Sequence, residues 1–147
     1  MSADMKAYAS SYVAAALLML GLDSIWLMLT ANNLYRPLIG DLMLDDFRPA
    51  PAIAFYALYI GGIVVFAIRP ALASGRWTTA LASGALFGLF AYGTYDLTNQ
   101  ATLKIWSTTI TVADMAWGSV LTAASATAGY LAARRLTATK NFRTSQS

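Results

Sequence analysis

The sequence contains no cysteine and no histidine, and because all seven acidic residues are aspartates, it contains no glutamate either. Without cysteine there are no disulfides, no thiol nucleophile and no thiolate metal site. Without histidine the usual general base is missing, and so are haem or zinc ligation by His or Cys and the His-rich di-iron sites of membrane desaturases. We therefore expect no metal and no cofactor.

Charge is also scarce. Only 12% of the 147 residues are charged, whereas 58% are hydrophobic, and the mean hydropathy is +0.54. A soluble domain of this size could not cover its surface with so few charges, so the composition is typical of a membrane protein. The net charge of +3 would suggest nucleic acid as the partner of a soluble protein. Here the basic residues lie beside apolar segments, so we expect membrane lipids as partners and no nucleic acid.

Four apolar segments are long enough to cross a membrane, at about residues 8–30, 52–68, 78–98 and 108–133. Each has roughly 17–26 residues, against about 20 needed to cross the hydrocarbon layer. The first is too long for a signal peptide and lacks a convincing small-residue cleavage site. The sequence predicts an all-α, polytopic membrane protein. Residues 1–135 would form a single bundle of four transmembrane helices, and residues 136–147 a disordered, basic cytoplasmic tail.

The basic residues predict the orientation of these four spans. One side would hold both termini and the loop of residues 69–77, with seven Lys and Arg residues, against three on the other side. Since cytoplasmic loops carry the excess of Lys and Arg, both termini are predicted to be cytoplasmic. The two sets are Lys6, Arg69, Arg76, Arg134, Arg135, Lys140 and Arg143 against Arg36, Arg48 and Lys104.

Three aspartates fall within or beside the predicted spans: Asp23, Asp96 and Asp114. An ionisable residue inside a membrane costs about 2.5–3.5 kcal/mol on insertion scales, so it usually faces the bundle interior. At a rise of 1.5 Å per residue, all three lie in the outer third of a core about 30 Å thick. We therefore predict a pocket open to the outer side. Its candidate ligand-binding residues are Asp23, Trp26, Tyr92, Tyr95, Asp96, Asn99, Asp114 and Trp117.

Plainer interpretations exist for most of these residues. Tryptophan and tyrosine gather at the interfaces of any membrane protein. Asp96 could be a solvated residue at a helix end, and Asp114 a favourable negative charge in the first turn of a helix. Asp23 has more than a turn of its span on both sides, which makes it the most specific signal in the sequence.

Three stretches carry a family resemblance: "LDSIWL" at 22–27, "YGTYDLTNQATLKIW" at 92–106 and "DMAWGSVLTA" at 114–123. They resemble a family of small bacterial four-helix inner-membrane proteins, domain-of-unknown-function family 2177. The resemblance covers nearly the whole chain except the tail. It implies a multi-pass protein of the bacterial inner (cytoplasmic) membrane, and it implies no activity. Members are often encoded near enzymes that modify membrane fatty acids, which favours lipids and a membrane enzyme partner.

Three functions fit these observations. The first is handling or modification of membrane lipid, or of another small hydrophobic ligand, at the outer pocket. The second is proton-coupled transport, since intramembrane aspartates are the usual proton sites, although four spans would then need a homodimer. The third is a non-catalytic assembly or binding module in which the aspartates join helices by hydrogen bonds. No nucleophile with an adjacent base and no cofactor motif is present, so the sequence leaves open whether the protein is an enzyme.

Overall fold

The computed structural model describes the backbone of residues 3–144 and the side chains of residues 5–136. The described residues form helices without any strand, so the predicted all-α fold class is confirmed. In chain order the segments are α1 (Ala3–Thr30), the π-helical η1 (Ala31–Tyr35), α2 (Arg36–Ile39), the 3₁₀-helical η2 (Gly40–Leu42), α3 (Pro49–Ile63), the π-helical η3 (Val64–Ile68), α4 (Arg69–Ser74), α5 (Trp77–Thr102) and α6 (Thr108–Thr144).

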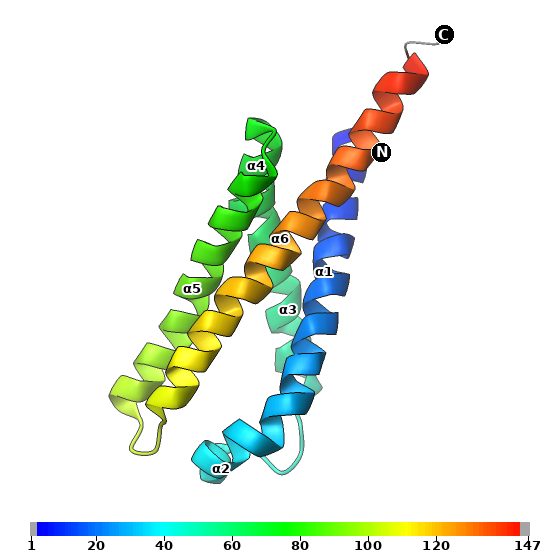
Figure 1. Ribbon diagram of the computed structural model, residues 1–147. Coiled ribbons are helices and arrows are strands. Elements are labelled where there is room, and N and C mark those ends of the chain that lie inside the picture. The colour runs from blue at the N-terminus through cyan, green and yellow to red at the C-terminus, as the bar shows by residue number, and fades with distance from the viewer. Residues whose placement is uncertain (1–2, 145–147) are drawn as a thin grey trace.

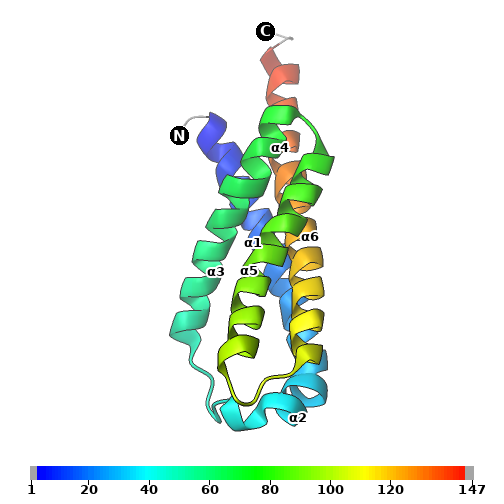
Figure 2. The same ribbon diagram turned by 90° about the vertical axis from the view of Figure 1, so that its left-hand side faces the viewer.

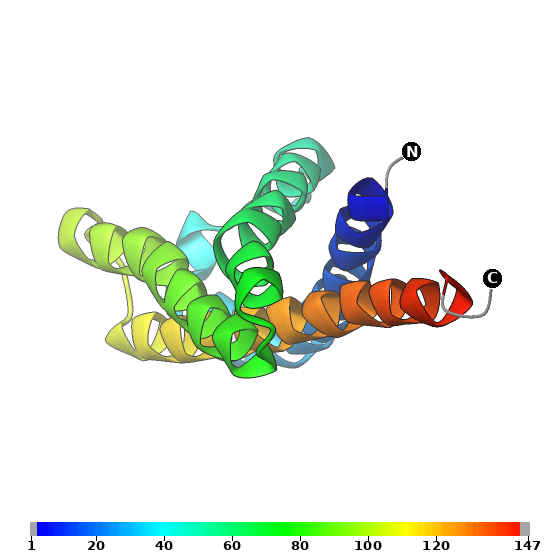
Figure 3. The ribbon, with the colours of Figure 1, turned by 90° about the horizontal axis from the view of Figure 1, so that it is seen from above.

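The long helices run side by side in alternating directions (Figures 1 and 2). Helices α1 and α5 run towards the end of the molecule that holds α2 and the loop of residues 103–107, which we call the α2 end. Helices α3, α4 and α6 run back towards the opposite end, which we call the α4 end. Viewed from above, α6 passes along both α5 and α1 (Figure 3), and these two helices make its most extensive contacts.

Two continuous helical stretches are long and apolar enough to cross a membrane, residues 5–42 and 49–74. They contain the predicted spans 8–30 and 52–68. The predicted spans 78–98 and 108–133 are helical and lie within α5 and α6, and that these two also cross the membrane stays a prediction. Large apolar side chains such as Met28 and Leu58 are 72% and 78% exposed, as side chains facing lipid are. The backbone of residues 136–144 continues α6, and residues 145–147 lie outside the described residues, so disorder of the tail at 136–147 stays a prediction.

Both π-helical segments lie directly before an Arg-Pro pair. Proline has no N–H to donate, and its ring clashes with the carbonyl four residues earlier. The chain widens by one residue just ahead of each proline: the N–H of Arg36 bonds the carbonyl of Ala31, and the N–H of Arg69 bonds that of Val64. These five-residue steps let the helix continue through Pro37 and Pro70 instead of ending.

Turn residues set the remaining helix ends. Pro49 stands in the first turn of α3, where its missing N–H has no intrahelical partner to lose. Helix α4 ends at Gly75, whose φ of +70° lies in the left-handed region that favours glycine. Arg76 is extended, and α5 begins at the next residue. This tight connection sets α4 against the start of α5.

Small residues bring α5 and α6 close together. A Cβ on Gly88 would lie 2.7 Å from Oγ1 of Thr122 and would also meet the backbone of Gly118. A Cβ on Gly84 would lie 2.9 Å from the carbonyl oxygen of Thr122 and from Cβ of Ala126. The two backbones therefore touch along this seam, as small residues allow in membrane helices. The seam fixes the position of Asp96, two turns beyond Gly88 on α5.

Candidate functional site

Asp23 joins three helices through its two carboxylate oxygens. The residue lies on α1 and is only 7% exposed. Its Oδ2 accepts a hydrogen bond from the hydroxyl of Tyr56 on α3 at 2.5 Å, and its Oδ1 accepts one from Nε1 of Trp117 on α6 at 3.0 Å. A carboxylate with both oxygens bonded across helices is stabilised where it is and stabilises the helix packing in turn.

Two indoles carry this network towards the α2 end. Trp26, one turn after Asp23, stacks on Trp117 with ring centroids 4.7 Å apart and an angle of 7° between the planes. Nε1 of Trp26 donates to the hydroxyl of Tyr35 at 3.0 Å, and this hydroxyl donates to Oδ1 of Asp114 on α6. Tyr35 is the last residue of η1, so the widened turn ahead of Pro37 carries one link of the network. We call the residues of this network the polar layer: Asp23, Trp26, Tyr35, Tyr56, Asp114 and Trp117.

Asp96 differs from the other two aspartates. It lies on α5 with 0% exposure, and neither carboxylate oxygen has a hydrogen-bond partner among the described residues. Its neighbour across the seam is Asp114, which is 6% exposed and close enough for the two charges to repel. An unpaired carboxylate in a dry site is costly. Asp96 therefore needs a proton, or a donor that the described chain does not supply.

The remaining candidates on α5 lie at the edge of this layer. Tyr92 is half-buried, its ring lies against Gly118, and it meets the ring of Tyr59 edge to face at 6.5 Å. The ring of Tyr95 is 58% exposed and packs edge to face on Trp106 at 5.6 Å. Asn99 is half-buried, and its carbonyl accepts the N–H of Leu103 where α5 ends.

The structure thus joins Asp23, Trp26, Asp114 and Trp117 in one network and places Asp96 beside it. Tyr95 faces outwards, away from that network. The contacts show a polar layer that joins α1, η1, α3 and α6. That it forms a pocket open to the outer side, and that any of its residues bind a ligand, stay predictions.

Two functional candidates were missed by sequence reasoning: Tyr35 and Tyr56, which donate to Asp114 and Asp23. A signal was available for Tyr56, because a hydroxyl inside an apolar span needs a partner. Tyr35 carried no such signal, since it lies in a segment that could equally have been an ordinary loop.

The side chains of the layer can exchange hydrogen bonds and protons. Among the described residues, no three carboxylates are grouped so that they could hold a metal ion. The layer thus combines the hydrogen-bond-accepting carboxylates of Asp23 and Asp114 with the donor hydroxyls of Tyr56 and Tyr35.

No curated protein and no solved structure matches the chain. One family model does match, over residues 8–131, and its description is "Predicted membrane protein (DUF2177)". The matched residues include all three stretches that suggested the resemblance and every residue of the polar layer. This chain therefore belongs to the DUF2177 family of predicted membrane proteins.

Proposed function

We propose that the protein crosses the bacterial inner membrane four times and binds a membrane lipid, or another small amphiphile, at the polar layer near its outer end. The family and the two apolar helical stretches support a membrane protein. The number of spans, the orientation and the ligand are the proposal.

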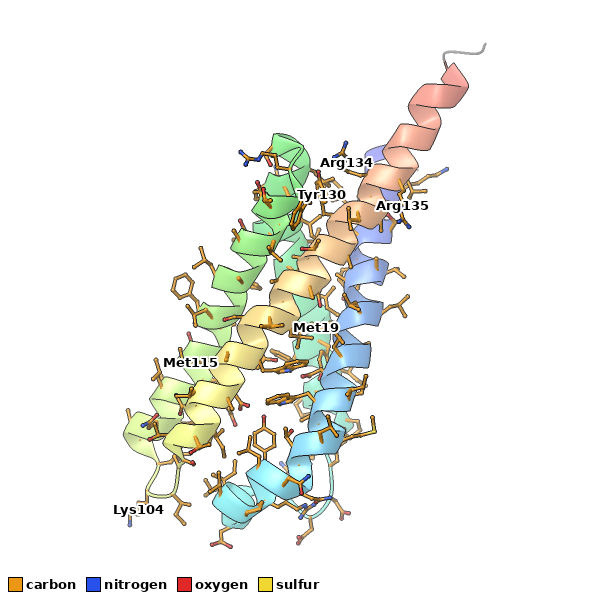
Figure 4. All side chains as sticks on the ribbon, viewed as in Figure 1. Met19, Lys104, Met115, Tyr130, Arg134 and Arg135 are labelled. Carbon is orange, nitrogen blue, oxygen red and sulfur yellow. The ribbon has the colours of Figure 1, made fainter. Side chains whose placement is uncertain are left out.

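The helix directions support an orientation with both termini in the cytoplasm. Arg134 and Arg135 lie near the α4 end, whereas Lys104 lies at the α2 end (Figure 4). Arg134 also holds the α4 end together, because its Nη1 donates to the carbonyl of Gly75 at 3.3 Å and to the hydroxyl of Tyr130 at 3.1 Å. The excess of basic residues at this end favours the cytoplasmic side for it.

The absence of cysteine gives a clean test of orientation. Single-cysteine variants Ser74→Cys and Lys104→Cys are treated in intact cells with a thiol reagent that does not cross the membrane. Labelling of Lys104→Cys alone is expected. Labelling of Ser74→Cys alone would place the polar layer in the inner leaflet and contradict the orientation.

The proposal of a ligand rests on one observation: the buried carboxyl of Asp96 lacks a donor from the described chain, while both carboxylate oxygens of Asp23 in the adjacent polar layer are bonded. A lipid headgroup that donates hydrogen bonds would supply the partners that the Asp96 carboxyl lacks. A lipid suits the position, because the residues around the layer include exposed apolar side chains such as Leu97 and Ile25. Polar groups of the opposite half, Ser11 and Ser125, are bonded to their own helix backbones, which disfavours a polar transport path through the molecule.

The test compares lipid extracts by mass spectrometry. Cells lacking the gene are complemented with wild type, Asp96→Asn or the matched control Asp45→Asn, which makes the same change at an exposed aspartate. Folded protein in the membrane is confirmed for each. A lipid species that changes in the deletion and is restored by wild type and Asp45→Asn, but not by Asp96→Asn, is expected. Identical profiles in all four strains would count against a role in lipid handling.

A further inference from the structure

The titratable groups near Asp96 are all acidic. Its carboxyl group is fully buried, and no described residue donates a hydrogen bond to either oxygen. Asp114 faces it from α6, Tyr35 approaches from η1, and Tyr95 is its neighbour on α5. None of these groups can supply positive charge. A carboxylate at this position would be desolvated and repelled, whereas the neutral acid would not.

The two carboxyl groups are not equivalent. Asp114 accepts a hydrogen bond from the Tyr35 hydroxyl, which stabilises its ionised form, and Asp96 accepts none. When two nearby carboxyls cannot both ionise, the one without a donor takes the proton. The single proton of this pair therefore belongs on Asp96.

We propose that Asp96 binds a proton while the site is empty, and that this proton is exchanged for the ammonium group of a bound ligand. The inference rests on the proposed function and names the chemistry of its ligand. In the exchange the O–H bond of Asp96 breaks, the proton passes to water on the outer side, and the carboxylate accepts an N–H of the ammonium group. One positive charge replaces another, so the net charge of the buried site is the same before and after the exchange.

The first measurement is an infrared titration of the full-length wild-type protein in phosphatidylglycerol nanodiscs without any amine. The carbonyl stretch of a protonated carboxylic acid is expected at neutral pH and should disappear as the pH is raised. Asp96→Asn should abolish this band, while Asp45→Asn should retain it. Absence of the band from wild type at neutral pH would overturn the proposal. Because this result needs no variant, it does not depend on whether Asp96→Asn folds.

The second measurement separates two sources of the ammonium group. Phosphatidylethanolamine is incorporated into the nanodiscs in one arm, and free ethanolamine is added in the other. Loss of the infrared band in either arm supports the exchange, and the arm that responds identifies the source. Competition with one proton also predicts that affinity for the responding amine falls about tenfold per pH unit on the acid side. A band that persists in both arms, or an affinity independent of pH, would overturn the exchange.

These outcomes distinguish the inference from the proposed function. If the lipid profile depended on Asp96 but no infrared band were seen, the proposed lipid handling would stand and the proposed proton on Asp96 would be contradicted. A proton on Asp96 with identical lipid profiles in deletion and wild-type strains would remove lipid handling, and the amine arms would then decide whether the exchange itself survives.

Discussion

Asp23 and Asp96 are the same residue type, at a similar level of the same protein, in opposite situations. Asp23 is 7% exposed and accepts two hydrogen bonds from residues on two other helices. Asp96 is 0% exposed and accepts none from the described chain. Burial alone does not distinguish these two carboxyls. The difference lies in whether the fold itself supplies the donors: it does for Asp23, which supports the packing, and it does not for Asp96, for which we propose a ligand.

The largest effect is expected from a substitution at the α5–α6 seam, which would disturb the surroundings of Asp23 and Asp96 together. Gly88→Val puts a branched side chain where even one Cβ would meet the backbone of Gly118, so α5 must move away from α6. We expect a loss of about 3–4 kcal/mol in the free energy of unfolding, measured by thermal or denaturant unfolding in detergent. Gly61→Ala is the control, because no atom lies within 4 Å of its added Cβ, and it should be neutral or stabilising. Equal stability of Gly88→Val and wild type would disprove the close seam.

The next effect concerns Asp23 alone. Asp23→Ala leaves the Tyr56 hydroxyl and the Trp117 N–H without their acceptor. We expect destabilisation by about 2–3 kcal/mol, since an unsatisfied buried donor costs roughly 1–3 kcal/mol. The double variant Asp23→Ala with Tyr56→Phe should recover part of the loss. If Asp23→Ala unfolded at the wild-type temperature, Asp23 would not be the structural member of the comparison.

Asp96 is expected to respond in the opposite direction. Asp96→Leu removes no hydrogen bond and replaces a polar group in a dry site with an apolar one that has the same number and branching of heavy atoms. Stability should be unchanged or higher by about 1 kcal/mol, because burying an unpaired polar group is costly. The measurement is the same unfolding assay, performed after delipidation. Destabilisation as large as that of Asp23→Ala would show that Asp96 has hydrogen-bond donors in the folded protein. The proposed difference between Asp23 and Asp96 would then be wrong.

The smallest effect is predicted at Tyr35. Tyr35→Phe removes the donor to Asp114 and the acceptor for Trp26 while keeping the ring. A loss of about 1 kcal/mol is expected. The change should also make Asp114 compete with Asp96 for the proton, so the infrared band should shift or divide between two sites. A spectrum identical to that of wild type would mean that Tyr35 does not decide which carboxyl is neutral.

Much of the framework follows from sequence, because long apolar runs between polar turns predict helices and a fixed rise per residue predicts depth. Asp23 and Asp114 share one hydrogen-bonded network with Asp96 beside it, and the seam forms where Gly88 and Gly118 face each other. The partners of the aspartates did not follow. Tyr35 is 79 residues from Asp114 along the chain, and its place depends on a π-helical turn ahead of Pro37 that no periodicity announces.

The α5 candidates show a second reason for incomplete prediction. Tyr95 and Asp96 are consecutive, so they lie about 100° apart around the helix. The structure buries Asp96 and exposes the ring of Tyr95 against Trp106. Sequence identifies which residues are chemically unusual, but the facing helix decides which of them receives a donor.

The most direct test of the central claim compares amine lipid retained by purified Asp96→Asn with that retained by the control Asp45→Asn, at matched stability. Lipid bound to each folded protein is extracted from nanodiscs of mixed phosphatidylethanolamine and phosphatidylglycerol and quantified by mass spectrometry. We predict that Asp45→Asn retains phosphatidylethanolamine as wild type does, and that Asp96→Asn unfolds at the wild-type temperature and retains several-fold less. Equal retention of phosphatidylethanolamine by both variants would contradict the proposal that a ligand donates hydrogen bonds to the Asp96 carboxyl.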